Sequence, residues 1–284
     1  MAVTTTTKGA RRLDTTSSVP SFHEYRRSSP YARSVSDHTI AVIHSGFEDA
    51  TGLDTGVSHA LLERVSAGEL AETFRIYQPS RVMAFGKQDR LSAGFAAAVQ
   101  VARDHGFDPV IRMPGGRAAV FHERTVAFSW TTPSSDPVRG IRERFAAATD
   151  VINHALSRLE IPSASGEIPG EYCPGEFSIH HAGQIKLAGI GQRLARRAAH
   201  VGGVLVVGDT RATRDVLVPT YRALGIDWDP STVGSINDII PEIEVQTVID
   251  SIVRVVAEHQ PIVPASVDAK TLARGRELAP LHVP

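Results

Sequence analysis

The sequence predicts an α+β fold in which a mainly antiparallel or mixed sheet is flanked by helices. Three observations support this prediction. Short apolar runs joined by tight turns, typical of hairpins, dominate the middle of the chain. Segments with helical spacing of apolar residues lie around them and fill the C-terminal part. Neither the glycine fingerprint of dinucleotide-binding folds nor a Walker-type phosphate loop is found at the positions such folds require.

Strands and helices alternate in the first half of the chain. Asp54 is expected to cap a helix, and Gly106 suits a left-handed cap at the end of the next one. Pro79 and Ser80 are expected to turn one strand into the next. The expected strands are 40–43, 74–77, 82–85, 110–112 and 126–130, and the expected helices run from Asp54 through Val65 and from residue 95 to 105.

The second half of the chain begins with an expected helix and a Pro-, Gly- and Ser-rich loop. A hairpin should follow, because two short apolar runs are joined by a polar segment that contains Gly183. The apolar stripes of the last helices are more typical of core-facing than of partner-binding surfaces. The expected elements are helices at 143–159, 211–223, 245–259 and 265–278, the hairpin strands 177–179 and 185–187, and a strand at 201–207.

Composition places the chain among ordinary globular proteins. Its net charge of -1 gives no general attraction to nucleic acid or to an anionic membrane, and no apolar run approaches the roughly 18 residues that span a bilayer. Residues 1–36, rich in Thr, Ser and Arg, are expected to form a disordered leader. An organellar transit peptide also fits that composition, but a clear amphipathic helix is lacking, and we expect a cytoplasmic protein. The main domain is expected at 37–230, with a helical C-terminal extension at 231–284 packed on it.

The chain has one cysteine, Cys173. A single cysteine rules out an internal disulfide and any multi-cysteine zinc or iron–sulfur site. The neighbouring His180 and His181 face opposite ways on a strand, and no set of His, Asp and Glu completes a site around them, so no metal is expected. Cys173 is therefore either inert or reactive, and its surroundings must decide.

Two arginines flank an adjacent pair of glycines in the segment that runs from Arg112 to His122. Gly115 and Gly116 let the backbone approach a ligand closely and direct successive N–H groups at an anionic oxygen. Arg112 and Arg117 can donate to a phosphate or a carboxylate. Taken alone, such a glycine pair is more often a tight turn with two solvated arginines.

The segment Tyr172-Cys173-Pro174-Gly175 places a turn directly after the cysteine, and Lys186 follows thirteen residues later. Such a turn would hold the thiol at the entry to a strand. A nearby lysine favours the thiolate, which is a good nucleophile and a fair leaving group for an acyl chain. The alternative is a buried, inert cysteine beside an exposed strand lysine.

Together these segments resemble the biotin/lipoate protein-ligase superfamily. That family has an Arg-x-x-Gly-Gly turn followed by Ala-Val and an aromatic residue, a Gly-x-x-Gln element, and a strand with Lys-x-x-Gly-x-x-Gln-Arg. The matching residues are Arg112, Gly115, Gly116, Ala119, Val120 and Phe121 in the turn, Gly86-Lys87-Gln88 with one residue fewer, and Lys186, Gly189, Gln192 and Arg193 on the strand. The resemblance covers roughly residues 54–207 and implies a biotin/lipoate ligase-like catalytic domain.

Within the superfamily, the chain most resembles the cysteine-dependent transferases that move an octanoyl group from the glycine cleavage H protein to another protein. In these, a Tyr-Cys-Pro-Gly segment carries the acyl thioester, and the lysine that follows lowers the pKa of the thiol. Two departures stand out. Arg117 replaces a third glycine of the ligase branch, and the interval from Cys173 to Lys186 is one residue longer, which would turn Lys186 to the other sheet face if the shift is not absorbed.

The resemblance implies an octanoyl or lipoyl transferase in which Cys173 and Lys186 are catalytic and no cofactor is required. Implied partners are the H protein, the lipoyl domains of 2-oxoacid dehydrogenases and acyl carrier protein, and an apolar slot near Val120 and Ile190 would hold the chain. The implied substrate-binding residues are Gly86, Gln88, Arg112, Gly115, Gly116, Arg117, Val120, His122, Gly189 and Gln192. Alternatives are a lipoate–protein ligase that uses ATP and Mg and in which Cys173 is incidental, and a non-catalytic binder of acylated carriers.

Overall fold

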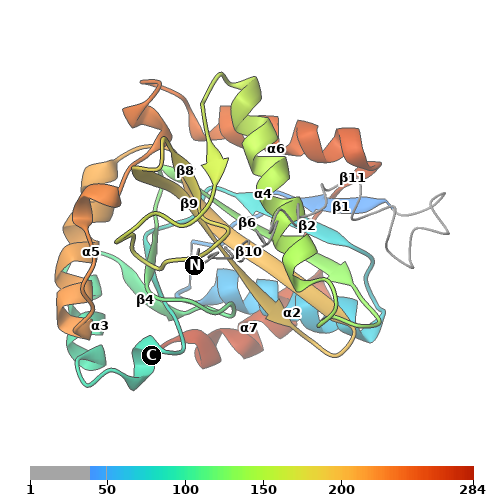
Figure 1. Ribbon diagram of the computed structural model, residues 1–284. Helices are drawn as coiled ribbons and strands as arrows, with labels where there is room; N and C mark the ends of the chain where they lie inside the picture. The colour runs from blue at the N-terminus through green and yellow to red at the C-terminus, as the bar shows by residue number, and fades with distance from the viewer. Residues whose placement is uncertain (1–38, 49) are drawn as a thin grey trace, which may run out of the picture.

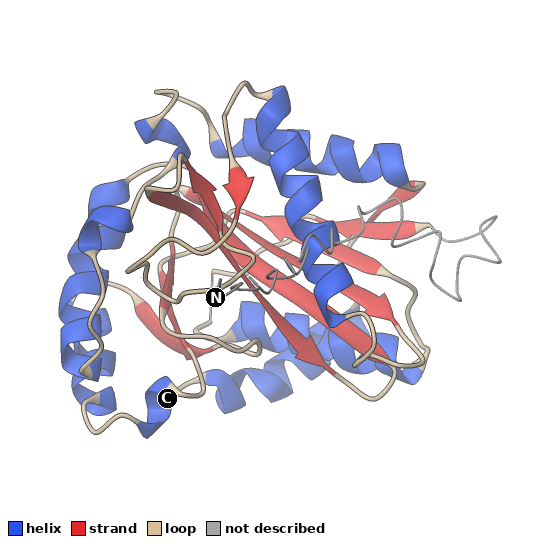
Figure 2. Ribbon diagram, viewed as in Figure 1, coloured by secondary structure: helices blue, strands red, loops and turns tan. Residues whose placement is uncertain are grey.

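The computed structural model describes residues 39–48 and 50–284, so the predicted leader at 1–36 lies outside the described residues. A mixed eight-stranded sheet with the order β11-β1-β2-β6-β10-β9-β8-β7 crosses the molecule, and a three-stranded sheet with the order β4-β3-β5 lies beside it (Figures 1 and 2). The strands are β1 (Ile40–Ile43), β2 (Thr73–Tyr77), β3 (Val82–Phe85), β4 (Asp108–Ile111), β5 (Ala119–Phe121), β6 (Thr125–Pro133), β7 (Ala164–Ser165), β8 (Ile179–His181), β9 (Ile185–Leu194), β10 (Ala198–Val206) and β11 (Ile262–Ala265).

Two pairs of helices cover the faces of the large sheet, and a third pair packs against the small one (Figure 1). The first face carries α4 and α6, whose apolar side chains form the main core with Phe74, Phe128 and Trp130. The opposite face carries α2 and α7, while α3 and α5 pack on β4 and β5. The helices are α2 (Leu53–Ala67), α3 (Phe95–Asp104), α4 (Ile141–Arg158), α5 (Thr210–Leu224), α6 (Val245–His259) and α7 (Ala269–Leu278), with short 3-10 turns η2 (Asp89–Leu91), η3 (Pro230–Thr232), η4 (Ile236–Asp238) and η5 (Ala279–His282).

The predicted fold class is confirmed. β1 and α6 begin and end at the predicted residues, and β8 pairs with β9 as the predicted antiparallel hairpin. A bulge between Ile179 and His180 shifts the register of this hairpin. Because a bulge adds one residue to one strand of a pair, it can absorb a change in spacing such as the longer interval before Lys186.

Pro79 and Ser80 lie between β2 and β3 as predicted, and the chain passes there from the large sheet to the small one. Two local predictions are wrong. Asp54 does not cap α2: the cap is Gly52 in a left-handed conformation, and the Asp54 carboxylate pairs with the buried Arg75. The last predicted helix, 265–278, begins at Ala269, and residue 265 belongs instead to β11, which pairs in parallel with β1. The sequence pattern also missed the short strand β5.

The C-terminal segment packs within the sheet and helix layers formed by the preceding chain. β11 is the edge strand of the large sheet and α7 packs on α2, so residues 231–284 are built into the same layers as the preceding chain. The boundary at residue 230 stays a prediction. Among the described residues, no helix is both long and apolar enough to cross a membrane.

Candidate functional site

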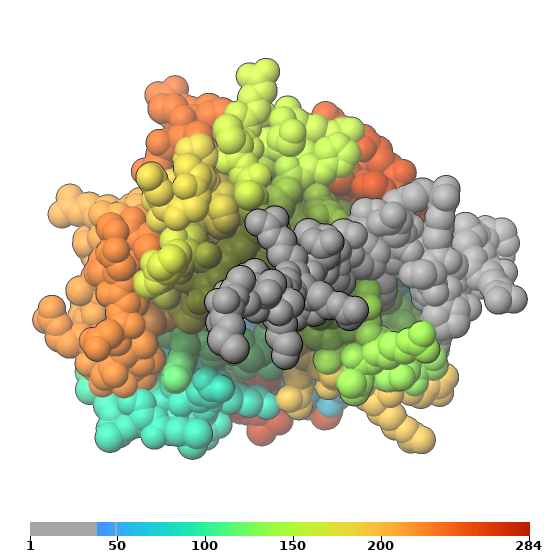
Figure 3. Space-filling model, in the orientation of Figure 1, coloured from blue at the N-terminus to red at the C-terminus, as the bar shows by residue number. Residues whose placement is uncertain are grey.

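Cys173 lies in a tight loop that a buried carboxylate organises. Its φ of 45° falls in the left-handed region, which few residues other than glycine adopt. The carboxylate belongs to Glu171, which is 3% exposed. Its Oε1 accepts hydrogen bonds from the Gly175 N–H (3.1 Å) and the Ser178 hydroxyl (2.9 Å). These bonds fix the chain on both sides of the thiol. In Figure 3, the segment around residues 160–180, which contains Cys173, is coloured yellow-green. It lies on the same face of the molecule as the teal segment around residues 85–105.

Lys186 holds the backbone of this loop rather than its sulfur. The Nζ atom donates to the carbonyl oxygens of Tyr172 (2.9 Å) and Cys173 (2.8 Å) and lies 4.8 Å from the centre of the Tyr172 ring. It also lies 3.0 Å from Oε2 of Glu171, an ion pair that is not aligned as a hydrogen bond. The predicted direct pairing with the thiol is thus corrected: the charge is near, but its bonds go to the main chain.

The sulfur is held instead by the glycine-rich turn. Sγ of Cys173 accepts hydrogen bonds from Nη2 of Arg112 (3.0 Å) and from the backbone N–H of Arg117 (3.2 Å). Burial alone raises the pKa of the Cys173 thiol, but the positive charges of Arg112 and Lys186 and the two hydrogen bonds outweigh burial, so the pKa lies below its ordinary value. The site therefore favours the nucleophilic thiolate.

Only one of the two adjacent glycines is constrained. Gly116 has a φ of 101°, and a Cβ placed on it would lie 2.8 Å from the Cys173 sulfur, closer than real contacts allow. Gly115 is exposed, and a Cβ there would meet nothing within 4 Å. Gly116 is therefore the position that brings the next N–H group, that of Arg117, onto the sulfur.

A second buried carboxylate supports this turn from behind. Asp89, fully buried in η2, accepts hydrogen bonds from the Gly86 N–H (2.8 Å) and from Nη1 of Arg117 (3.3 Å). Burial raises the pKa of Asp89 against the opposing effect of both donors. A Cβ on Gly86 would collide with the Gly116 carbonyl, so the two backbones are in direct contact. Sequence reasoning missed Asp89 and Glu171, whose only signal is that each adjoins a quoted motif.

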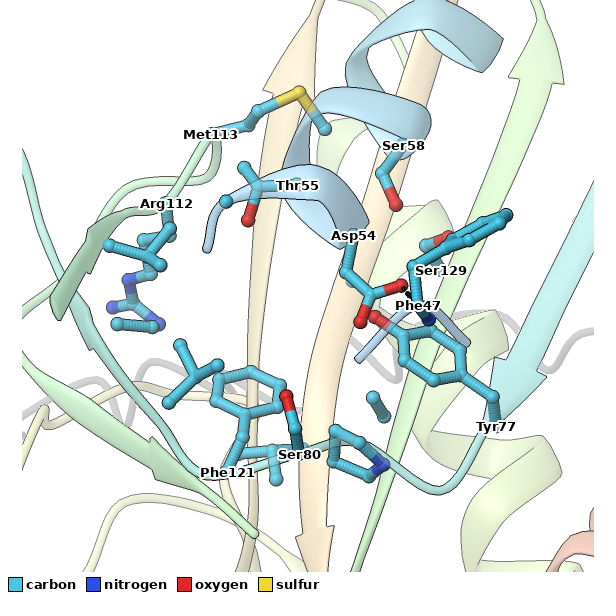
Figure 4. A pocket seen from close by; sticks show the side chains of 18 of the residues that line it. Phe47, Asp54, Thr55, Ser58, Tyr77, Ser80, Arg112, Met113, Phe121 and Ser129 are labelled. Atoms are coloured by element: carbon cyan, nitrogen blue, oxygen red, sulfur yellow. Dashed lines mark hydrogen bonds between the residues drawn. The ribbon is translucent and has the colours of Figure 1, made fainter. Parts of the chain in front are cut away.

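An apolar pocket of about 110 Å³ lies between the two sheets, and Arg112 is part of its wall (Figure 4). Phe121 and other residues of β3, β4 and β5 form one wall, and β6, β9 and β10 form the floor. Gly189 and Gly202 lie on the floor, where missing side chains leave space above the sheet. Of the predicted binding residues, Arg112 and Gly189 line this pocket.

Val120 and Ile190, which were predicted to line the acyl slot, face away from the pocket. Val120 is buried in the core between the small sheet and its helices, and Ile190 packs against the core under α4 and α6. Their strand neighbours Phe121 and Gly189 line the pocket instead. Because successive strand residues face opposite sides, an error of one position moves a side chain to the other face.

Three further residues that were predicted to bind substrate lie away from the pocket. His122 is fully buried, with Nε2 bonded to the Thr213 hydroxyl at 2.9 Å. Gln192 accepts a hydrogen bond from Nε of Arg144 at 2.9 Å, on the α4 side of the sheet. Gln88 is exposed. None of the three lines the pocket, and none contacts the sulfur.

Known proteins share sequence and fold with this chain. The lipoyl protein ligase A/B catalytic domain model matches residues 54–257. Proteins named octanoyl-[GcvH]:protein N-octanoyltransferase are similar to the chain: that of Exiguobacterium sp. is 27% identical over 185 residues, covering 62% of this chain and 65% of the relative, and that of Geobacillus kaustophilus is 26% identical over 187 residues, covering 66% and 65%. The chain thus spans slightly less than two thirds of the length of these relatives.

Two solved structures share the fold. Lipoate-protein ligase A bound with ATP superposes with a TM-score of 0.67 at 16% identity, covering 85% of this chain and 94% of that one. A bi-partite lipoate protein ligase from Thermoplasma acidophilum gives a TM-score of 0.67 at 16% identity, covering 86% and 93%. Both likenesses support the predicted ligase-like arrangement of sheet and helices.

Proposed function

The chain belongs to the lipoyl protein ligase A/B catalytic domain family, and on that premise we propose that it transfers an octanoyl group, through a thioester on Cys173, to a lysine of a lipoyl-carrier domain. The observation that carries the proposal is that the sulfur of Cys173 accepts a hydrogen bond from the guanidinium of Arg112, which also lines an apolar pocket. The names of the similar proteins suggest the octanoylated glycine cleavage H protein as donor.

In the first step, the Cys173 thiolate attacks the carbonyl carbon of the octanoyl-lysine amide on the donor. The S–C bond forms, the C–N bond breaks, and the departing lysine amine takes up one proton. The N–H groups of Arg112 and Arg117 that now contact the sulfur lie beside the reacting carbonyl, where donors stabilise the developing oxyanion.

In the second step, a neutral lysine amine of the acceptor attacks the thioester. The C–N bond forms, one proton is released, and the thiolate returns to its two donors. A thiolate that is stabilised in this way is also a better leaving group. Because one amide is exchanged for another, the overall reaction needs no ATP and no other cofactor.

Glu171 and Lys186 serve this mechanism by fixing the loop. Lys186 donates to the carbonyl oxygens of Tyr172 and Cys173 and pairs with Glu171, so the sulfur stays where the turn can hold it. Other carriers proposed as partners are the lipoyl domains of 2-oxoacid dehydrogenases and acyl carrier protein. A cytoplasmic location is proposed as well.

The test is intact-mass spectrometry after incubation with octanoylated H protein. We expect an octanoyl adduct on Cys173 that hydroxylamine removes, and its transfer to an added lipoyl domain. Cys173→Ala should retain the fold and form no adduct. Full transfer by this variant would remove the thioester mechanism.

The same assay separates transfer from ATP-dependent ligation. Free octanoate with ATP and Mg should yield neither pyrophosphate nor acylated lipoyl domain. Pyrophosphate release that survives in Cys173→Ala would identify a ligase in which the thiol is incidental. Binding of the acylated carrier with neither adduct nor pyrophosphate would identify a non-catalytic binder.

A further inference from the structure

Two walls of the apolar pocket come from segments that are far apart in the sequence. Gly52, Thr55 and Ser58 belong to the α2 wall, and Arg112 and Met113 belong to the wall that continues from β4. Figure 4 shows side chains of both walls around the same space. The guanidinium of Arg112 also donates to the sulfur, so a contact that fixes this second wall also fixes a donor to the thiol.

A histidine near the end of the chain joins the two walls. His282 in η5 is 8% exposed, and its Nδ1 lies 2.8 Å from the carbonyl oxygen of Ile111, the residue before Arg112. Its Nε2 lies 3.1 Å from Nδ1 of His59, which follows Ser58 on α2. The two rings meet edge to face, with centroids 5.2 Å apart. His282 therefore connects α2 to the end of β4.

The hydrogen bonds of the two rings determine which nitrogens carry protons. A carbonyl oxygen can only accept, so Nδ1 of His282 carries a proton and donates to Ile111. In the neutral ring Nε2 of His282 is then bare, and the donor between the rings is Nδ1 of His59. Nε2 of His59 is bare as well and lies 3.9 Å from the Glu63 carboxylate. One added proton fits there, but a second would set two N–H groups and two positive charges against each other.

The surroundings of the two rings oppose their charging. Burial is the main cause that lowers the pKa of both His59 and His282 below the ordinary histidine value. Both rings are therefore neutral at neutral pH, and they become charged only as the pH falls below about 6.5. The Glu63 carboxylate is the group that favours a charged His59. The other charged and titratable groups near the two rings are Lys87, Arg193, His200 and Arg274.

We infer that His282 is a positioning residue for the thiol of Cys173. Through Ile111 it keeps Arg112 on the sulfur, and through His59 it makes that position depend on pH. The brace, defined as the contacts from His59 through His282 to Ile111, holds with no added proton or with one and breaks when both rings are charged. Neither ring lines the pocket. The part of the brace in acyl transfer rests on the proposed function, whereas its effect on the thiol does not.

The test measures how fast iodoacetamide alkylates Cys173 in the full chain, from about pH 5 to about pH 8, by intact mass. Only the thiolate reacts, so below the pKa of the thiol the rate falls about tenfold for each pH unit. In the unmodified protein we expect a further loss of about threefold or more at the low end of this range, because both histidine rings become charged there.

Two substitutions at the same position separate positioning from packing. His282→Ala removes both contacts and should slow alkylation at neutral pH about tenfold, the effect of a rise of one unit in the pKa of the thiol. His282→Asn has an amide N–H that can replace Nδ1 as donor to Ile111, and it cannot be protonated. It should react at close to the unmodified rate at neutral pH and lack the further loss at low pH. His59→Ala, which keeps the bond to Ile111, should behave like His282→Asn.

His154→Ala is the matched control. His154 and His259 form another pair of neighbouring rings, with centroids 6.4 Å apart, on α4 and α6 at the opposite face of the sheet. This variant should keep both the rate and the further loss at low pH. An unmodified rate in His282→Ala, an equal slowing in His282→Asn, or a further loss that persists in His282→Asn would each overturn the inference.

The remaining outcomes also decide. If circular dichroism shows that His282→Ala does not fold, the low-pH comparison of His282→Asn with the unmodified protein decides alone. Alkylation as expected, with no thioester from octanoylated H protein, would contradict the proposed transfer and leave the positioning role standing. Equal thioester formation in all variants, with alkylation also unchanged, would leave the transfer standing and overturn the positioning role.

Discussion

Two regions meet at Cys173 and control it in different ways. The turn from residue 112 to 117 acts on the sulfur itself, through a guanidinium and a backbone N–H. The region from Glu171 to Lys186 acts on the backbone, through a buried ion pair and two carbonyl contacts. The first region therefore acts on the thiol by direct contact. The second fixes the position of the thiol and adds the charge of Lys186, which also lowers the pKa of the thiol. The comparison teaches that Lys186, the cation expected to pair with the thiol, donates its hydrogen bonds to the backbone instead.

The largest effect is expected from Lys186→Met. This change leaves the Glu171 carboxylate buried without its partner, and a broken buried ion pair destabilises a protein by about 3–5 kcal/mol. Urea unfolding followed by circular dichroism measures the loss. The double variant Glu171→Gln with Lys186→Met should recover part of it, since no buried charge remains unpaired. A loss below about 1 kcal/mol in the single variant would contradict the anchoring role.

Gly116→Ala should come next. The added Cβ would crowd the Cys173 sulfur and force a non-glycine residue into a left-handed conformation, which costs about 1–2 kcal/mol. We expect a lower unfolding midpoint together with loss of the thioester. Gly115→Ala, where a Cβ meets nothing within 4 Å, is the matched control and should do neither. Equal effects at both glycines would break the distinction between them.

Arg112→Met should change reactivity more than stability. Without the guanidinium, a charge and a hydrogen bond that lower the pKa of the Cys173 thiol are lost, so this pKa rises. Since the thiolate fraction grows as pH rises through the pKa, the midpoint of iodoacetamide alkylation should move to higher pH, and each unit slows the reaction at neutral pH about tenfold. In the unmodified protein, that midpoint should lie below about 8.5, the value of a free thiol.

Arg117→Met is the control for this experiment. Arg117 contacts the sulfur through its backbone N–H, which the substitution keeps, while its guanidinium pairs with Asp89. The alkylation midpoint should therefore stay close to that of the unmodified protein. A shift as large as that of Arg112→Met would show that the positive charge acts on the thiol without regard to contact.

The smallest effect is expected from Arg142→Ala. Arg142 pairs with Glu176, three residues after Cys173, but both side chains are more than half exposed. Exposed ion pairs contribute little to stability because water and salt screen them. Unfolding midpoint and thioester yield should both stay unchanged. A clear loss of thioester alone would indicate that this pair helps to position the cysteine loop.

What could be predicted from the sequence was local. The hairpin around Gly183 depends on short-range backbone requirements, and the structure places it as expected. The turn after the cysteine lies at residues 175–178 rather than at Pro174-Gly175, and only Gly116 of the glycine pair has a positive φ. Arg112 was predicted to donate hydrogen bonds to an anionic group. In the structure, its guanidinium donates to the sulfur of Cys173.

What could not be predicted depends on contacts between distant segments. Asp89 and Glu171 are acidic residues in loops, and nothing in their spacing indicates that folding buries them beneath the site. Val120 and Ile190 were predicted to line the pocket, but each is one position away from a residue that does. Side chains alternate between the two faces of a strand, and the sequence does not say which face borders a cavity. The passage from β2 to β3 crosses between sheets, which a proline-containing turn does not reveal.

The C-terminal residues complete the framework that carries Arg112. His282 in η5 bonds through Nδ1 to the Ile111 carbonyl at 2.8 Å, and β11 pairs with β1 more than two hundred residues earlier in the chain. Contacts between such distant segments form slowly because a long loop must close. During synthesis, α2 and the strand before Arg112 therefore gain these contacts only after residues 262–282 have been made. A nascent chain stalled before residue 262 would expose apolar surface that chaperones recognise.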